Sequence, residues 1–197
     1  MDHVLAILGF AAVTAFTPGP NNTMLMISGA NWGVAPSVPH MLGITIGFPL
    51  MVFAVGMGLG GLFETYPVLH EILKYVSFAY LVYLAWKLAR SGRHDVEGAR
   101  QGKPMTFLAA ALFQWVNPKA WVMAITAMAL FVPAGSPMLP AVLLLAAIFA
   151  LTSLPSAATW CLFGSAIARF LDSDRRVAVF NGAMALLLVL SMVPTLF

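Results

Sequence analysis

Long apolar segments make up nearly the whole chain, separated by short connections that are charged or rich in proline and glycine. A helix that crosses the hydrocarbon core of a membrane needs about 20 mostly apolar residues. Six segments reach this length, at about 4–30, 38–62, 68–89, 105–132, 138–163 and 176–197. The pattern therefore predicts an all-α membrane protein with six transmembrane helices that form a single domain over residues 1–197.

The composition agrees with a membrane location. Hydrophobic residues account for 61% of the chain and charged residues for 9%, whereas soluble domains carry about 25% charged residues. A soluble fold of this size leaves too much surface exposed to hide so many apolar side chains. We expect the lipid bilayer as a partner and no nucleic acid. The single cysteine, Cys161, excludes an internal disulfide, and we expect neither a metal nor a cofactor.

The basic residues predict how the helices are oriented. Eight of the ten lie at or between the ends of the third and fourth segments or of the fifth and sixth: Lys87, Arg90, Arg93, Arg100, Lys103, Arg169, Arg175 and Arg176. With six helices these two loops lie on the same side, and an excess of Lys and Arg marks the cytoplasmic side. We therefore expect a multi-pass protein of the bacterial inner membrane with both termini outside.

The order of the segments predicts an inverted repeat. Repeat one covers about 1–90, a cytoplasmic loop about 91–104, and repeat two about 105–197. Because each half has an odd number of helices, the second half enters the membrane from the opposite side, as in many secondary transporters. The first helix of each half contains a proline motif near mid-span, and the second helix of each half contains an internal proline, Pro49 or Pro155.

The two proline motifs predict that the first and fourth helices are broken at mid-membrane. They read Phe-Thr-Pro-Gly-Pro-Asn-Asn at 16–22 and Phe-Gln-Trp-Val-Asn-Pro-Lys at 113–119. Proline removes a backbone donor and clashes with the preceding turn, and such a break is tolerated only inside protein or beside a water-filled cavity. Asn21 or Asn22 suits the N-cap of the new half-helix, and Asn117 followed by Pro118 suits the same role in the fourth helix.

Broken helices offer groups that suit an amino acid. The N-terminus of a half-helix is electropositive and binds a carboxylate, while the carbonyls at the opposing C-terminus suit an ammonium group. Phe16, Trp115 and Trp121 add aromatic faces for a cation. The alternative is that the prolines only kink the helices for packing.

Lys119 is the one ionisable residue near mid-membrane. Burying a lysine there costs about 2.5–3.5 kcal/mol on insertion scales, which suggests that it pairs with a substrate carboxylate or exchanges a proton. The alternative is a structural lysine bonded to carbonyls of the broken first helix, and the two roles are compatible. No Asp or Glu lies inside a span, so we expect neutral substrates. If transport is coupled to protons, the titratable candidates are Lys119 and His40.

Four motifs resemble the LysE/RhtB family of amino-acid exporters: residues 17–22, 43–48, 79–87 and 114–119. The resemblance implies export of amino acids or their derivatives, driven by the proton-motive force. The doubled Asn21-Asn22 and Phe48 look closest to the cysteine/O-acetylserine exporter branch. The family resemblance implies a substrate-binding role for residues 18–21 and 117–119. The full set of expected substrate-binding residues is Thr17, Pro18, Gly19, Pro20, Asn21, Asn22, Gln114, Asn117, Pro118 and Lys119.

Other functions fit the sequence less well. An intramembrane protease needs a serine nucleophile and a histidine base at depth, and Ser165 has no such partner in any span. A passive channel, or an exporter of a metabolite that is not an amino acid, remains the alternative. The sequence leaves the substrate, the stoichiometry and the oligomeric state open, a homo-oligomer included.

Overall fold

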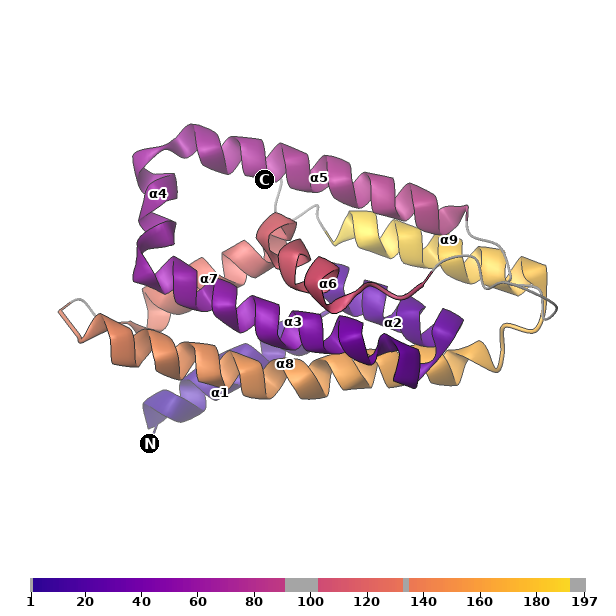
Figure 1. The fold of residues 1–197 in the computed structure, drawn as a ribbon, viewed down its shortest axis with the longest axis horizontal. Coiled ribbons are helices and arrows are strands. Elements are labelled where there is room, and N and C mark those ends of the chain that lie inside the picture. The colour runs from indigo at the N-terminus through magenta and orange to yellow at the C-terminus, as the bar shows by residue number, and fades with distance from the viewer. Residues whose placement is uncertain (1, 91–102, 133–134, 192–197) are drawn as a thin grey trace.

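The computed structural model describes residues 2–90, 103–132 and 135–191, and all regular structure in these ranges is helical. Each predicted segment corresponds to one helix or to a run of consecutive helices (Figure 1). The elements are α1 (Asp2–Phe16), α2 (Pro20–Trp32), α3 (Val34–Ala54), a π-helical turn (Val55–Leu59), α4 (Gly60–Thr65), α5 (Pro67–Ala89), α6 (Phe107–Phe113), a 3-10 turn (Gln114–Val116), α7 (Pro118–Phe131), α8 (Met138–Ala168) and α9 (Asp174–Leu190).

Length and composition identify fewer membrane-spanning helices than the sequence predicts. Among the described residues, Val34–Leu59 and Met138–Ala168 are long and apolar enough to cross a membrane on their own. The bent pair α1 and α2 would make a third span if it crosses as one unit. Helix α7 and the segment Phe107–Val116 are apolar but short. The protein is therefore an apolar helical bundle that suits a membrane, and the count of six spans stays a prediction.

The chain is interrupted at both proline motifs. Helix α1 ends at Phe16 and α2 begins at Pro20, with an angle of 54° between them. Helix α6 ends in a 3-10 turn, Asn117 takes an extended conformation, and α7 begins at Pro118. Proline suits the first position of a helix because the amide hydrogen that it lacks would have no intrahelical partner there. The broken first and fourth segments are thus confirmed, whereas their depth in a membrane stays a prediction.

Helix α8 lies at the centre of the packing. It contacts α1, α2 and α3, while α3 also packs on α6, and α5 packs on α9. Small residues allow these backbones to approach closely. A side chain at Gly29 or Gly164 would meet backbone atoms across the α2–α8 contact, and one at Gly43 or Gly47 would meet α6. Gly43 and Gly47 therefore allow α3 to pack closely on α6.

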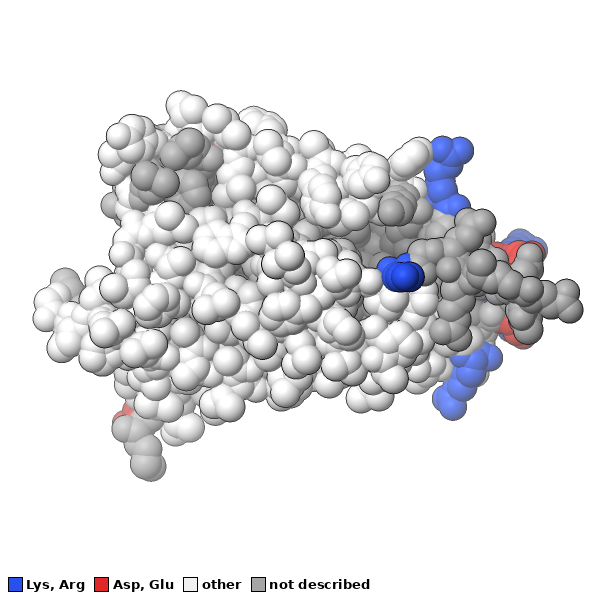
Figure 2. Space-filling view, in the orientation of Figure 1, with Lys and Arg blue, Asp and Glu red and all other residues white. Residues whose placement is uncertain are grey.

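Basic side chains gather at one end of the bundle. Arg90 follows α5, Arg169 follows α8, and Arg175 and Arg176 begin α9. In Figure 2 the Lys and Arg side chains in view lie toward this end, whereas α1 begins at the opposite end in Figure 1. The described basic residues at these helix ends thus share one end of the bundle (Figure 2), and the orientation in the membrane stays a prediction. Most of the predicted cytoplasmic loop, with Arg93 and Arg100, lies outside the described residues.

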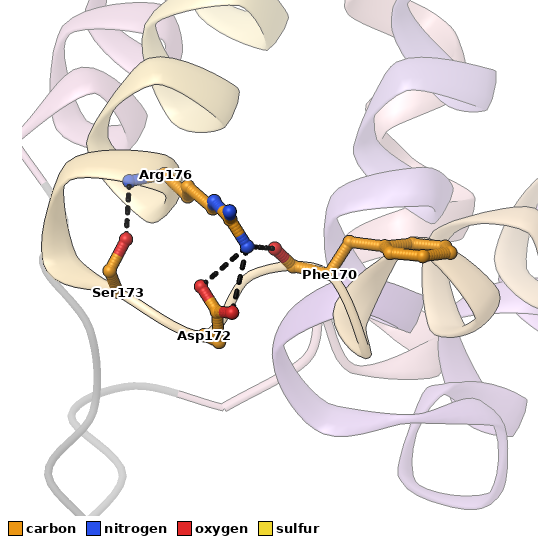
Figure 3. Close-up of polar contacts among 4 residues, drawn as sticks. All are labelled: Phe170, Asp172, Ser173 and Arg176. Carbon is orange, nitrogen blue, oxygen red and sulfur yellow. Dashed lines mark hydrogen bonds and ion pairs between the residues drawn. The ribbon is translucent and has the colours of Figure 1, made fainter.

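The α8–α9 connection is held by local polar contacts (Figure 3). The Ser173 hydroxyl accepts a 3.4 Å bond from the amide of Arg176 and caps α9. The Arg176 guanidinium donates to both carboxylate oxygens of Asp172 at 2.7 Å and to the Phe170 carbonyl at 3.3 Å. Both charged side chains are mostly exposed, so the ion pair contributes about 0–1 kcal/mol.

Candidate functional site

The two breaks face a common small cavity. Its volume is about 40 Å³, and space for one water takes about 10–15 Å³, so it holds a few water molecules and no amino acid. The walls come from both breaks, from α3 through Ile44 and Phe48, and from α8. The polar lining residues nearest the breaks are Gly19, Asn21, Asn22, Asn117 and Lys119, joined by Ser153 and Ser156 of α8.

Asn22 binds the end of α1 and not the start of α2. Its Nδ2 donates to the carbonyl of Ala15 at 2.8 Å and to that of Thr17 at 2.9 Å. The expectation that Asn21 or Asn22 caps α2 is therefore wrong, because Gly19 occupies the N-cap position and no side chain bonds there. The physical reason lies in Pro18 and Pro20, which lack amide hydrogens and leave α1 carbonyls in need of other donors.

Lys119 reaches from the second break to the first. Its Nζ donates to the carbonyl of Thr17 at 2.7 Å and to that of Pro18 at 3.2 Å. The stem of the lysine lies against Gly19, where an added Cβ would be 2.7 Å from Lys119 Cδ. The structural role that the sequence left as an alternative is thus present. A role in substrate binding is compatible with it, since Lys119 also lines the cavity.

A second link joins the breaks through two amide side chains. Asn21 Nδ2 donates to Gln114 Oε1 at 2.8 Å, and Gln114 Nε2 donates back to Asn21 Oδ1 at 3.1 Å. Gln114 Nε2 also donates to the carbonyl of Ala110 at 2.9 Å. Gln114 is fully buried, so this reciprocal pair fixes the position of the 3-10 turn relative to α2.

The remaining predicted residues lie near the cavity without lining it. The backbone turns and side-chain contacts next to the cavity lining are formed by Thr17, Pro18, Pro20, Gln114 and Pro118. The three aromatic candidates do not line it either: Phe16 is 40% exposed, and Trp115 and Trp121 pack edge to face at 6.1 Å.

His40 is buried in α3 and does not line the cavity. It lies four residues before Ile44, which does, so the two side chains share one face of α3. The structure therefore places this proton-coupling candidate one helical turn away from the cavity.

Helix α8 contributes polar groups that the sequence reasoning missed. Ser153 and Ser156 line the cavity, and the Ser156 hydroxyl donates to the Ala15 carbonyl at 2.8 Å. Pro155 lies between them, and the sequence predicts it to be the internal proline equivalent to Pro49. The polar residues beside Pro155 were therefore the signal that could have identified these two serines. No Asp or Glu belongs to the lining formed by the described residues.

Interrupted apolar helices around a small cavity with a few polar groups are the architecture of many secondary transporters. The comparison of sequences agrees: residues 12–193 match the family described as LysE type translocator, and the chain belongs to this family. It is therefore a membrane translocator and not an enzyme.

Named relatives cover nearly the whole chain. The cysteine/O-acetylserine efflux protein of Escherichia coli (strain K12) is 32% identical over 181 residues, which are 91% of this chain and 90% of the relative. The protein of the same description from Shigella sonnei (strain Ss046) gives the same values. No solved structure matches the chain.

Proposed function

We propose that the protein is a secondary transporter that exports small neutral amino acids or close derivatives from the cytoplasm by proton antiport. The observation that carries the proposal is the cavity between the two breaks, into which Lys119 and two half-helix N-termini project positive charge without an acidic neighbour. The relatives named as cysteine/O-acetylserine efflux proteins support this substrate class.

The carboxylate of the substrate binds at the start of α2 and α7. The first amides of a helix have no partner within it, and here they adjoin Lys119. A carboxylate is a stronger partner for an ammonium group than a carbonyl is. Its arrival therefore draws Lys119 Nζ away from Thr17 and Pro18, which loosens the link between the two breaks.

Release of this link starts the transport cycle. The cavity is too small for an amino acid, so binding requires the halves to move apart. Part of the packing supports two inverted repeats, since α1 contacts α8 as α6 contacts α3, while the extensive α2–α8 contact has only a slight counterpart between α7 and α3. Rocking of one repeat against the other opens the site to each side in turn.

Proton coupling is assigned to Lys119 in preference to His40. Lys119 meets both the cavity and the carbonyls of the first break, so its protonation state changes the link directly. His40 lies a turn away. We expect His40→Gln to keep exchange that is accelerated by a pH gradient, measured in proteoliposomes at several internal pH values. Loss of the acceleration in this variant, with exchange itself retained, would transfer the coupling role to His40.

The decisive test of the function is counterflow. Proteoliposomes loaded with one neutral amino acid should accumulate the same labelled amino acid saturably, and an imposed pH gradient should accelerate the exchange. Flux that rises linearly with concentration indicates the passive channel instead. An absence of exchange across a panel of amino acids, with folded protein, directs the search to metabolites of another class.

Ser165→Ala separates transport from intramembrane hydrolysis. Ser165 lies at the α2–α8 crossing, where its amide faces Gly29 and not the cavity. We therefore expect unchanged exchange in the variant, within about twofold, because surface or packing substitutions with little volume change have small effects. Complete loss of function with normal folding would favour the intramembrane protease over the transporter.

A further inference from the structure

The carbonyls at the end of α1 are already occupied. The Ala15 carbonyl accepts from Asn22 and Ser156, and the Thr17 carbonyl accepts from Asn22 and Lys119. A carbonyl oxygen has two lone pairs, so each of these two oxygens has its full set of donors. While Lys119 keeps its bond, these two oxygens offer no free lone pair to the ammonium group of a substrate, so an acceptor that is already free in this structure is the better candidate.

Asn117 carries an acceptor that no protein group uses. The residue lines the cavity and is 2% exposed, yet its Oδ1 is buried without a hydrogen-bond partner. Asn117 occupies the N-cap of α7 in an extended conformation, but its side chain makes no capping bond. A buried polar group without a partner is rare and destabilising, which indicates that a ligand supplies the missing hydrogen-bond donor.

The other amides at the breaks differ from Asn117. Asn21 is held in the reciprocal pair with Gln114, and Asn22 Nδ2 donates to two carbonyls, while Asn22 Oδ1 is not among the buried atoms that lack a partner. The Thr23 hydroxyl is also buried without a partner, but Thr23 does not line the cavity. The unused acceptor on the cavity wall therefore belongs to the second break, beside the lysine.

We propose that Asn117 Oδ1 accepts a hydrogen bond from the α-ammonium group of the substrate, while Lys119, two residues further along, holds the carboxylate. This rests on the proposed function and deepens it, because it makes Asn117 the residue that selects α-amino acids. A molecule with the same side chain and carboxylate but no amino group leaves Oδ1 unpaired. Sites built to bond a substrate group discriminate strongly against analogues that lack it.

The test compares a substrate with its deaminated analogue. Labelled L-cysteine, kept reduced, is exchanged in counterflow while unlabelled L-cysteine or 3-mercaptopropionate competes. In the wild-type protein we expect L-cysteine to compete at least about tenfold better. Asn117→Leu should abolish this preference. Asn31→Leu is the control, since Asn31 lies near the end of α2 and does not line the cavity.

Thermal unfolding without substrate supplies a second readout. Because Oδ1 lacks a protein partner, Asn117→Leu should unfold at the same temperature as the wild type or higher, even though its selectivity is lost. A clear fall in unfolding temperature would show that the amide has a structural partner and would overturn the inference. An unchanged preference in Asn117→Leu would also overturn it. Failure of the wild-type protein to exchange L-cysteine contradicts the proposed function for that substrate, whereas the unfolding result still decides the inference.

Discussion

Lys119→Met is expected to lower amino-acid exchange by about 30-fold or more while the protein stays folded. Methionine preserves an unbranched stem against Gly19 but removes the charge and the bonds to Thr17 and Pro18. Loss of one partner of a buried, hydrogen-bonded charge pair costs about 2–5 kcal/mol, and each 1.4 kcal/mol is about tenfold. Initial rates of counterflow in proteoliposomes, at matched protein density, measure the effect.

Lys74→Met is the matched control. Lys74 belongs to α5 and does not line the cavity, so the same substitution there should leave exchange nearly unchanged. Thermal unfolding of both variants in detergent separates lost transport from lost structure. The Thr17 carbonyl keeps its bond from Asn22 in the Lys119 variant, so any destabilisation arises mainly at Pro18 and amounts to about 1–3 kcal/mol. Exchange at the wild-type rate and with the wild-type pH dependence would refute both roles given to Lys119.

The helices and their breaks could be predicted from local chemistry. Proline has a fixed backbone and no amide hydrogen, and the motifs around Pro20 and Pro118 interrupt their helices, whereas the single prolines Pro49 and Pro155 lie inside continuous helices. Apolar length determined the other elements, with boundaries that moved by a few residues: the fifth segment was expected to end at 163, and α8 ends at Ala168.

The partners of the polar groups could not be predicted in the same way. Asn22 caps α1 across the break, and Gln114 meets Asn21 over a sequence separation of 93 residues. Both contacts depend on how two half-helices cross, and side-chain types alone do not determine a crossing. The contribution of Ser156 was missed for the same reason, because it acts on the Ala15 carbonyl from a helix 141 residues away.

These contacts underlie the two roles that we propose for Lys119. Proline breaks expose carbonyls that must be satisfied in an apolar environment, and the lysine satisfies two of them in the absence of substrate. The same bonds keep the ammonium group beside the cavity. A site that is stable when empty and responsive to a carboxylate therefore follows from one side chain, and an acidic partner for Lys119 would remove that response.

Gly164→Ala is expected to destabilise the protein strongly through the α2–α8 crossing. An added Cβ at Gly164 would overlap the Met26 carbonyl, and one at Gly29 would overlap the Cys161 carbonyl across the same contact. Overpacking costs about 1–3 kcal/mol and occasionally more. We expect the upper part of this range, because a backbone carbonyl in a helix cannot rotate away as a side chain does.

Gly182→Ala in α9 provides the comparison. A Cβ there meets nothing within 4 Å, so alanine should be neutral or stabilise α9 by about 1 kcal/mol through its higher helix propensity. Thermal unfolding in detergent and the monodisperse fraction after extraction measure both variants. The α2–α8 contact also positions the site, since α2 carries Asn22 and α8 carries Ser156, which share the Ala15 carbonyl. Residual folded Gly164→Ala protein should therefore exchange amino acids more slowly, and equal stability of the two variants would show that the helices do not cross this closely.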